Sequence, residues 1–500
     1  MEESKNHSIG EDQKSYRQII KATSLFGGVQ AFSIIIAIIR SKFIAVLLGP
    51  TGMGIYGLLT STTGFIASLT NFGLRTAAVK DVSLAATSEN DAEVSKVVTV
   101  LRKLVWITGI IGMILTAVLS KWLSEFTFGS EEYTFAFIWI SVTLLFDQLS
   151  SGQMVVLQGL RKLHYLARAN VIGLIIGLLI TVPLYYFFRL DGIIPVIIIT
   201  SFTSMVLSWF FARKVRIEFT KISRYETMAL GKKMFKLGFV LSLNGIIVSL
   251  VSYLVRAYIS NSGSVEQVGL YNSGFTIINM YVGLVFAAMG TDYYPRLSGV
   301  AEDNEKSRLL INQQAEVAVL ILAPILTVFL VFIYWVIILF YSIKFITISD
   351  MIYWAAIGLL FKAASWSIAY IILAKGAFAL FFWNELIANF YQFVFNIIGY
   401  RFAGLEGLGI SYLVGYFLYF IQVYYIAKIK YTFSFNITFY KIAGLQLFIC
   451  ILCFVCVKYL SSPWTYVFGS VFIVISVIHS LRELEKKVGL KEVLSKRPKD

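Results

Sequence analysis

The sequence predicts an all-α membrane protein that crosses the bilayer about fourteen times, and three observations support this fold class. Hydrophobic residues make up 58% of the chain, and the mean hydropathy is +0.77. Charged residues make up only 14%, well below the roughly 25% of a soluble domain. The apolar residues form continuous runs of about 20, the length that a helix needs to cross a bilayer. Because these runs are continuous rather than alternating, they indicate helices and argue against a β-barrel.

Each apolar run is followed by a shorter polar segment, and together the runs define the expected spans. The fourteen expected spans are residues 24–48, 53–73, 101–120, 134–158, 164–188, 191–212, 236–257, 268–290, 311–335, 349–373, 378–400, 407–427, 439–460 and 463–481.

Lysine and arginine predict the orientation of these spans. If the N-terminus is cytoplasmic and the chain alternates, inner segments hold 34 of the 43 Lys and Arg residues and outer segments hold 5. This asymmetry follows the positive-inside rule and predicts that both termini are cytoplasmic. The N-terminus lacks the layout of a cleavable signal peptide, so we expect the first span to remain in the mature protein. The net charge of +15 follows mostly from topology and from attraction to anionic lipids, and it requires no nucleic-acid partner.

An internal repeat organises most of the chain. The segment "AIIRSKFIAVLLGPTGMGIYG" aligns with "YLVRAYISNSGSVEQVGLYNS", and the offset is 216 residues. Since six helices separate the two copies, both have the same orientation, which predicts a parallel repeat about an axis along the membrane normal. The charged pairs that share an offset of 216 or 215 are Arg40 with Arg256, Lys80 with Arg296, Asp147 with Lys362, and Asp191 with Glu406.

The repeat predicts the division of the chain into lobes. The expected parts are a cytoplasmic N-terminal segment (1–23), an N-lobe of helices 1–6 (24–212), a basic cytoplasmic linker (213–235), a C-lobe of helices 7–12 (236–427), helices 13 and 14 (439–481) and a basic cytoplasmic tail (482–500).

Two motifs that suggest a cofactor or a metal do not fit their context. Gly52-x-Gly54-x-x-Gly57 matches a dinucleotide fingerprint, but no strand precedes it, and the second copy of the repeat has Gln267 in place of the first glycine. We interpret it as a short outer turn between two helices, and we expect no cofactor.

Cys450, Cys453 and Cys456 lie in an apolar helix with neither a fourth ligand nor a histidine nearby, so we expect packed or lipid-facing cysteines and no metal site.

The motifs resemble those of a known superfamily of exporters. Two six-helix lobes, together with "GPTGMGIYGLLTSTTGFIASLTNFGLRTAAVK" and "VGLYNSGFTIINMYVGLVFAAMGTDYYPRLS", resemble the O-antigen and polysaccharide flippases of the multidrug, oligosaccharidyl-lipid and polysaccharide exporter superfamily. The resemblance covers residues 20–430. It implies a central cavity between the lobes, alternating access, and movement of an undecaprenyl-diphosphate-linked sugar repeat unit across the bacterial cytoplasmic membrane. It also implies membrane lipids as partners, with a polysaccharide polymerase and chain-length machinery as further candidates. Typical members of this branch have twelve spans, so helices 13 and 14 are an expected addition.

Basic residues in the spans are candidates for binding the diphosphate. Arg40 and Lys42 lie in the first span, and Arg256 is the repeat partner of Arg40. Two arginines that face one cavity repel each other unless an anion lies between them, and guanidinium groups suit phosphate oxygens. The alternative is that these side chains extend to the outer head groups. Near the inner ends of spans two and eight, we expect Arg75, Lys80, Asp292 and Arg296 either to receive the diphosphate or to anchor the helices.

Three further charges are candidates for gating or ion coupling. Asp147 and Lys362 occupy equivalent places in the two lobes, so they could form an ion pair at a gate, and either could bind a coupling proton. Alternatively, each is satisfied within its own lobe by a polar neighbour such as Gln148 or Ser365. Glu385 is a shallower candidate.

Three functions compete at this point. A flippase for lipid-linked oligosaccharides fits the basic first span. A proton- or sodium-coupled drug exporter on the same scaffold usually has an acid there instead. A membrane glycosyltransferase or polymerase needs an acidic metal site or a large outer loop, and the outer loops here are short. We therefore expect a transporter and not an enzyme.

Overall fold

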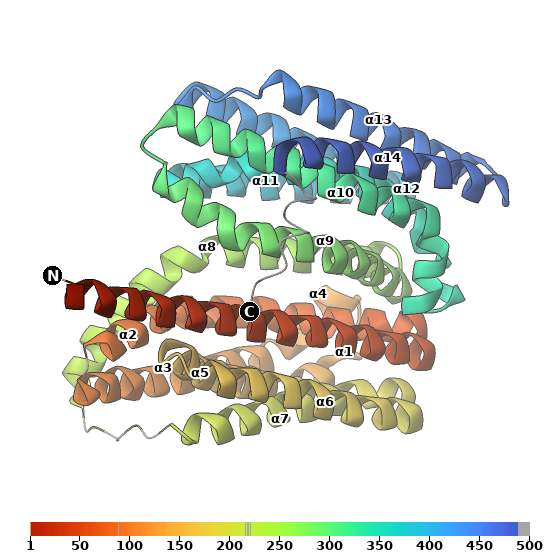
Figure 1. Ribbon diagram of the computed structural model, residues 1–500. Helices are drawn as coiled ribbons and strands as arrows, with labels where there is room; N and C mark the ends of the chain where they lie inside the picture. The colour runs from red at the N-terminus through yellow and green to blue at the C-terminus, as the bar shows by residue number, and fades with distance from the viewer. Residues whose placement is uncertain (1, 89, 216, 218–219, 221, 489–500) are drawn as a thin grey trace. The chain divides into compact units, whose positions relative to one another are not determined.

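The computed structural model describes residues 2–88, 90–215, 217, 220 and 222–488, which are helical nearly throughout and include no strand (Figure 1). The predicted all-α class is therefore confirmed. Residues 489–500 of the expected basic tail lie outside the described residues, as do Met1 and four positions of the expected linker.

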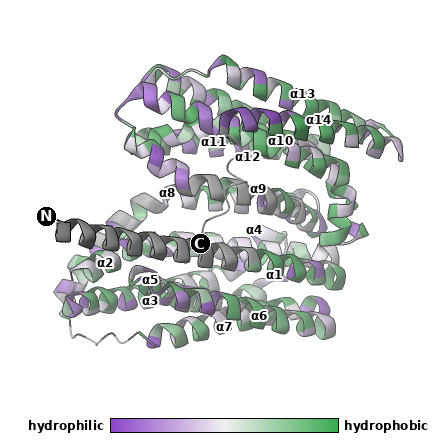
Figure 2. Cartoon of the chain, viewed as in Figure 1, coloured by the Kyte–Doolittle hydropathy of each residue, from purple (hydrophilic) through white to green (hydrophobic). Residues whose placement is uncertain are grey.

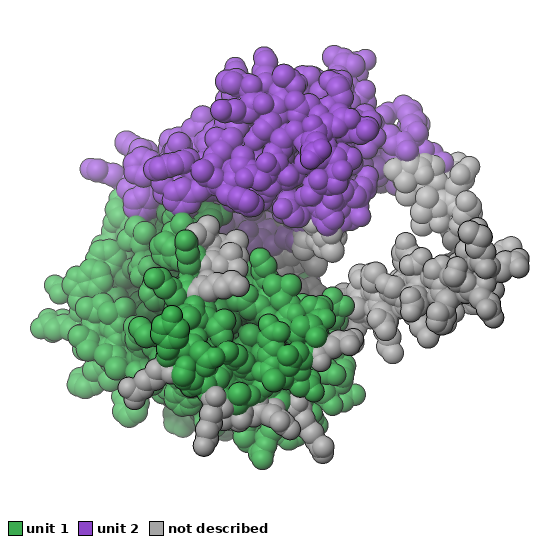
Figure 3. Space-filling view, turned by 90° about the vertical axis from the view of Figure 1, so that its left-hand side faces the viewer, with its two compact units in different colours: residues 1–266 green, residues 267–500 purple. Residues whose placement is uncertain are grey.

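The chain forms two compact units, residues 1–266 and 267–500, drawn in separate colours in Figure 3. The helix that begins the expected C-lobe falls in unit 1, because its packing partners lie there. The lobe boundaries drawn from the repeat remain a prediction.

Unit 1 contains eight α-helices and one short 3-10 helix among its described residues. These are α1 (Glu2–Asn71), α2 (Leu74–Thr87), α3 (Asp91–Val118), α4 (Ser120–Phe128), α5 (Thr134–Gly159), α6 (Leu163–Phe188), η1 (Arg189–Gly192), α7 (Ile193–Arg213) and α8 (Arg224–Ser262).

Unit 2 contains six further α-helices and a second 3-10 helix among its described residues. These are α9 (Val265–Gly299), whose first two residues belong to unit 1, then α10 (Asn304–Phe340), η2 (Ile343–Ile348), α11 (Ser349–Ala374), α12 (Phe378–Tyr431), α13 (Ile437–Tyr459) and α14 (Trp464–Val488).

Ten helical stretches of the described residues are long and apolar enough to cross a membrane (Figure 2). Three of them have 40, 51 and 54 residues, at least twice the roughly 20 that one crossing needs. Each of the three is interrupted, at Gly49, at η1 and at Ala403–Gly404. The chain is therefore polytopic, while the number fourteen remains a prediction.

The glycine-rich stretch of the sequence forms a break inside α1. Gly49 has φ 69° and ψ −170°, a conformation that favours glycine, and Pro50 follows it. Gly54 lies in the helix after the break, where a Cβ would come within 1.9 Å of the Val265 carbonyl oxygen. The corresponding place in the second copy is the break between Ser262 and Val265. These glycines therefore serve chain reversal and close packing.

Within unit 1, α8 packs against α1, α2, α3 and α4. Its start is fixed by a capping box, in which Ser223 and Glu226 bond each other's backbone N–H. Lys96 of α3 donates a 2.6 Å hydrogen bond to Glu226, and this bond lowers the pKa of Glu226 below its ordinary value. Farther along α8, the Tyr253 hydroxyl lies 2.8 Å from Thr127 Oγ1, and its ring stacks on Phe65 of α1 at 5.6 Å. These contacts hold the start of α8 and the region around Tyr253 against the other helices of unit 1.

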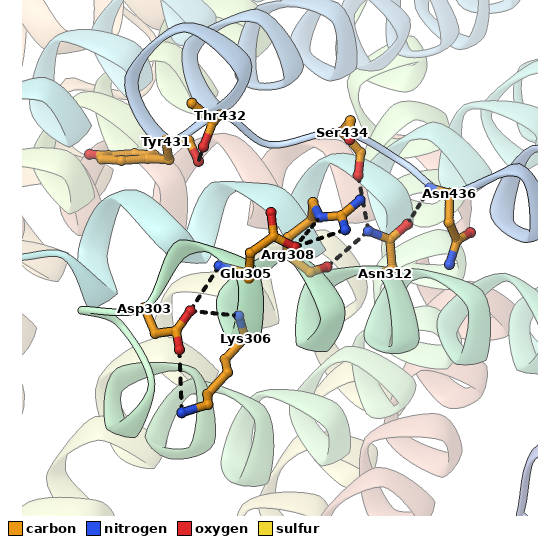
Figure 4. Close-up of polar contacts among 9 residues, drawn as sticks. All are labelled: Asp303, Glu305, Lys306, Arg308, Asn312, Tyr431, Thr432, Ser434 and Asn436. Carbon is orange, nitrogen blue, oxygen red and sulfur yellow. Dashed lines mark hydrogen bonds and ion pairs between the residues drawn. The ribbon is translucent and has the colours of Figure 1, made fainter.

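Within unit 2, the connection from α12 to α13 folds back onto α10 (Figure 4). Asn312 donates to the Ser434 carbonyl at 3.1 Å and accepts from the Asn436 backbone N–H at 2.8 Å. Nearby, the Asp303 carboxylate caps α10 by accepting from the N–H groups of Glu305 and Lys306 at 3.0 Å each.

Helices α13 and α14 join unit 2 through ion pairs with its other helices. Lys487 of α14 lies 2.5 Å from Glu316 of α10, whose side chain is buried. Lys458 of α13 pairs with Glu406 of α12 and lies 3.9 Å from Asp350 of α11. Cys450 and Cys453 are buried against α10. The two added helices are therefore packed as part of the unit.

Candidate functional site

The predicted charged residues divide between the two units. Unit 1 contains Arg40, Lys42, Arg75, Lys80, Asp147 and Arg256, and unit 2 contains Asp292, Arg296, Lys362 and Glu385. Within each unit, the surroundings of these residues are described below, and any pairing between units remains a prediction.

Arg40 lies on α1 roughly two turns before the break at Gly49. Its side chain is half-buried, and its Nε atom is buried without a hydrogen-bond partner among the described residues. The Tyr185 hydroxyl of α6 interacts electrostatically with Arg40, and it is likewise buried and unpaired within the described part of the chain. A ligand that accepts hydrogen bonds would satisfy these donors, because a buried donor without a partner costs about 1–3 kcal/mol. Lys42, two residues on, is also half-buried.

Arg256 lies on α8 roughly two turns before its end at Ser262, a depth similar to that of Arg40. Its Nη1 donates to the Ser252 carbonyl oxygen at 2.7 Å and also bonds the Ser252 hydroxyl. Unlike Arg40, this guanidinium is therefore held by its own helix. That contact fixes the direction of the side chain.

The four charges expected near the inner ends of the spans are surface groups in the structure. Arg75 and Lys80 are exposed on α2. Asp292 and Arg296 form an exposed ion pair on α9, with 3.0 Å between Oδ2 and Nη1. Such an exposed pair contributes little to stability. Because Arg75 and Arg296 lie in different units, the expected cluster of all four remains a prediction.

Asp147 lies on α5 within a predicted span, and its side chain is exposed. Ser201 of α7 donates a 2.5 Å hydrogen bond to its Oδ1. Gln148, named above as an alternative partner, donates its Nε2 to Thr108 at 2.8 Å and to Asn71 at 3.2 Å. The polar partner of Asp147 within its own unit is therefore Ser201, and a role of Asp147 in gating or ion coupling remains a prediction. A carboxylate with one serine partner and an open side can take a proton, a cation or water.

Lys362 of α11 is surrounded by aromatic rings. Its Nζ lies 5.1 Å from the ring centre of Tyr416 and 5.8 Å from those of Tyr412 and Phe286, and it donates to the Tyr412 hydroxyl at 3.3 Å. Aromatic faces attract cations, so the rings stabilise the ammonium in place of an anion. Ser365, named above as an alternative partner, donates its hydroxyl to the Lys362 carbonyl oxygen at 2.9 Å.

A row of tyrosines on α12 connects Lys362 with Glu385. The tyrosine row consists of Tyr412, Tyr416 and Tyr419, whose successive ring centres lie 4.6 Å and 6.4 Å apart. At its far end, the Tyr419 hydroxyl donates to Glu385 Oε1 at 2.5 Å. The tyrosine row therefore has a cation hydrogen-bonded at one end and an acid hydrogen-bonded at the other, both in unit 2.

Close packing of α11 against α12 sets up this arrangement. A Cβ on Gly409 would lie 2.2 Å from the Met351 carbonyl oxygen, and one on Gly358 would lie 2.9 Å from the Tyr412 ring. Small residues at both places let the two helices approach closely. Tyr412 can therefore reach Lys362.

Sequence reasoning missed Ser201 and the tyrosine row. The tyrosines had a detectable signal, because "SYLVGYFLY" spaces them four and three residues apart, which puts them on one face of a helix. Ser201 had none, since a single serine in an apolar span is usually bonded to its own helix. Among the described residues, no group of three His, Cys, Asp or Glu side chains could hold a metal ion.

The sequence is similar to a known protein family and to a known flippase. Residues 43–350 match a family model described as "Polysaccharide biosynthesis protein". The chain is 20% identical over 395 residues to the lipid III flippase of Escherichia coli (strain K12), which covers 76% of this chain and 91% of that protein.

Two solved structures of membrane transporters have a fold similar to that of this chain. One is an inward-facing multidrug resistance MATE family transporter of the MOP superfamily, with a TM-score of 0.69, 14% identity, and coverage of 80% of this chain and 94% of that one. Another is the lipid II flippase MurJ in an inward closed conformation, with a TM-score of 0.63, 14% identity, and coverage of 94% and 99%. At this identity the likeness is one of fold.

Proposed function

This chain belongs to the polysaccharide biosynthesis protein family, and on that premise we propose that it is a flippase for a lipid-diphosphate-linked oligosaccharide. The cargo is an undecaprenyl-diphosphate-linked repeat unit of a surface polysaccharide similar to O-antigen. The chain moves it across a bacterial cytoplasmic membrane by alternating access, with both termini cytoplasmic. It works as a transporter, and it passes its cargo to the polymerase and chain-length machinery that build the polymer.

The observation that carries this proposal is the buried Nε atom of the half-buried Arg40 in the first span. A buried cation within the membrane is costly unless it has a partner. The Nε of Arg40 has no hydrogen-bond partner among the described residues, so a bound anion would complete its coordination. A lipid diphosphate is such an anion, and arginine binds phosphate oxygens with two parallel hydrogen bonds. The identity of a relative as a lipid III flippase supports the same cargo class.

The charges suggest a division of tasks during transport. Arg40, Lys42 and Arg256 hold the diphosphate, while Arg75 and Arg296 attract it from the cytoplasmic leaflet. Asp147, Lys362, Glu385 and Asp292 govern gating or ion coupling, since a change of protonation at an acid shifts the balance between conformations.

The test is complementation in cells that lack their own flippase for a compatible repeat unit. Arg40→Ala and Arg256→Ala should each reduce surface polymer roughly tenfold or more, as expected when a charge-assisted hydrogen bond is lost. Lipid-linked repeat units should accumulate at the same time. Arg40→Lys should restore part of the activity, because the charge remains but the paired hydrogen bonds do not.

Arg401→Ala is the matched control, since Arg401 is an exposed arginine next to the break in α12. It should leave surface polymer unchanged at equal protein levels in the membrane. Normal polymer in the double variant Arg40→Ala/Arg256→Ala would contradict phosphate binding at these residues and favour the alternative that they extend to lipid head groups.

An ion-coupled multidrug exporter is the second candidate, because a MATE transporter shares the fold. Increased drug susceptibility on deletion, with unchanged surface polymer, would favour it. The basic first span argues for an anionic cargo instead.

A further inference from the structure

A groove in unit 1 has no role in the function proposed above. It lies between α3, α5 and α7, which pack side by side, and has a volume of about 770 Å³. Its wall is mostly apolar, with Phe146 and Leu149 of α5 between Trp106 of α3 and Val206 of α7. Trp106 is 50% exposed and Val206 is 39% exposed. Exposed apolar side chains therefore line the groove, which suits a site entered from the hydrocarbon region.

Two arginines lie in the same groove. Arg102 comes from the first half of α3, and Arg213 is the last residue of α7. The Arg213 guanidinium lies over the Trp209 ring, with Cζ 5.3 Å from its centre, which directs the charge along the wall. Both arginines adjoin segments expected to be cytoplasmic. The groove thus combines an apolar body with a basic end at the depth of the inner head groups.

Two buried polar atoms of the groove have no hydrogen-bond partner within the described part of the chain. They are the Nε of Arg102, which is a donor, and the Oε1 of Gln153, which is an acceptor. Leaving such an atom without a partner costs free energy. A ligand that brings both an anionic acceptor and a hydroxyl donor would satisfy the two together.

We propose that this groove binds one anionic phospholipid of the cytoplasmic leaflet, with phosphatidylglycerol as the fitting head group. The phosphate lies between Arg102 and Arg213, the glycerol hydroxyl donates to Gln153, and an acyl chain follows Leu149, Phe146 and Val206. Basic pockets between transmembrane helices on the cytoplasmic side are suited to such head groups.

A resident membrane lipid fits better than the transported cargo. Trp106 and Val206 of its wall are exposed apolar side chains, so we expect the lipids of the leaflet to reach the groove directly and at high concentration. Occupancy at that concentration needs only modest affinity. The lipid fills the space between α3 and α7 and so stabilises their packing against α5.

The test uses the full-length protein, purified in a mild detergent and titrated with phosphatidylglycerol or phosphatidylcholine of the same acyl chains. Native mass spectrometry counts the bound lipid. Phosphatidylglycerol should bind at least about tenfold more tightly than phosphatidylcholine. The double variant Arg102→Gln/Arg213→Gln should bind phosphatidylglycerol roughly thirty-fold more weakly, which is the effect of losing two cations near a lipid head group. Equal binding of the two lipids, or an unchanged double variant, would overturn the proposal.

Three further measurements make the result specific. Arg168→Gln removes an exposed arginine of α6 in the same unit and should leave binding unchanged. Leu149→Trp fills the groove but keeps both arginines, so it should lower the affinity for both lipids. If this variant binds phosphatidylglycerol as tightly as the wild type does, the proposal is contradicted, even if the arginine variant fails to fold. A polyprenyl diphosphate that displaces phosphatidylglycerol at lower concentration would assign the groove to the cargo instead and overturn the phospholipid assignment.

Discussion

Asp147 in unit 1 and Lys362 in unit 2 occupy equivalent positions of the sequence repeat, yet their surroundings differ in kind. Asp147 is exposed and has Ser201 as a hydrogen-bond partner at 2.5 Å. Lys362 has three aromatic ring centres within 5.8 Å of its Nζ, together with the Tyr412 hydroxyl. The acid is open to a ligand, whereas the base is enclosed by its own unit.

The difference indicates that residues at equivalent positions of the repeat can have different roles. A carboxylate with an open side changes its charge state with whatever reaches it, such as a proton, a cation or water. An ammonium held by aromatic faces is stabilised in its charged form. We therefore expect Asp147 to be the variable element of the cycle and Lys362 to be a fixed charge, and the following predictions test that contrast.

The largest effect is expected at Asp147. Asp147→Asn keeps the size and the bond with Ser201 but removes the charge, so transport should fall roughly tenfold or more, within the range of coupled sites. Asp147→Glu should retain part of the activity. Surface polymer per unit of membrane-inserted protein is the measurement. Wild-type activity in Asp147→Asn would remove this residue from the mechanism.

Lys362→Met should lower transport severalfold without lowering stability. The methionine fills the same space among the rings but carries no charge, and replacing an enclosed charge with an apolar group often leaves stability unchanged. Lys362→Arg should retain most activity, because a guanidinium also binds aromatic faces. Thermal unfolding in detergent and surface polymer are measured in parallel. A loss of stability equal to the loss of transport would identify a purely structural residue.

Exchanging the two charges distinguishes separate roles from a direct pair. Asp147→Lys combined with Lys362→Asp should not recover activity, because an aspartate at 362 would place its negative charge against the negative faces of the rings. Complementation by each single variant is the reference. If the exchange restores transport that both single variants lose, then the two residues pair across the units, as the repeat alone suggests.

A smaller effect is expected at Tyr419, which donates to Glu385. Tyr419→Phe removes this bond and the longer one, 3.4 Å, that the hydroxyl accepts from Asn384 Nδ2. It should cost roughly 1 kcal/mol in the stability of the folded protein, the usual scale for a hydrogen bond between transmembrane helices. Tyr425→Phe is the control, since Tyr425 is an exposed tyrosine of the same helix. If both variants melt at the same temperature, the bond to Glu385 contributes nothing measurable.

The smallest effect is expected at Asp303, an acid outside the membrane-spanning segments. The backbone N–H of Lys306 lowers the pKa of Asp303 below its ordinary value of 3.8. Because the pKa in the folded state is depressed, the stabilisation is present above pH 3.8 and disappears as the pH falls through the folded-state value. Asp303→Ala should therefore lower the melting temperature slightly at pH 7, and the difference should shrink below about pH 3. A difference that grows with acid would contradict the cap.

Much of the fold was accessible from the sequence, because apolar runs of membrane length can satisfy their backbone hydrogen bonds only as helices. The breaks in α1 and between α8 and α9 were predicted from "GPTGMGIYG" and its second copy, since glycine and proline interrupt helices. The pieces of the site were predicted less completely. The charges of the spans stood out by their rarity, whereas neither Ser201 nor the enclosure of Lys362 could be predicted from composition.

The sequence by itself determined that this is a helical membrane protein with an internal repeat, a basic first span and a small set of charges within its spans. The helical class and the scarcity of charges follow from the high cost of placing polar groups in hydrocarbon, which acts on each segment independently of its neighbours. The repeat is read directly from the alignment of the two halves. Only the tertiary structure decided that Ser201 reaches Asp147, that the tyrosine row links Lys362 with Glu385, and that α13 and α14 are tied to unit 2 by Lys487 and Lys458. Those contacts join residues far apart in the chain, and they depend on which faces of two helices meet. Which face of a helix makes contact depends on the close packing of many side chains from several helices. The sequence of one segment therefore does not predict it.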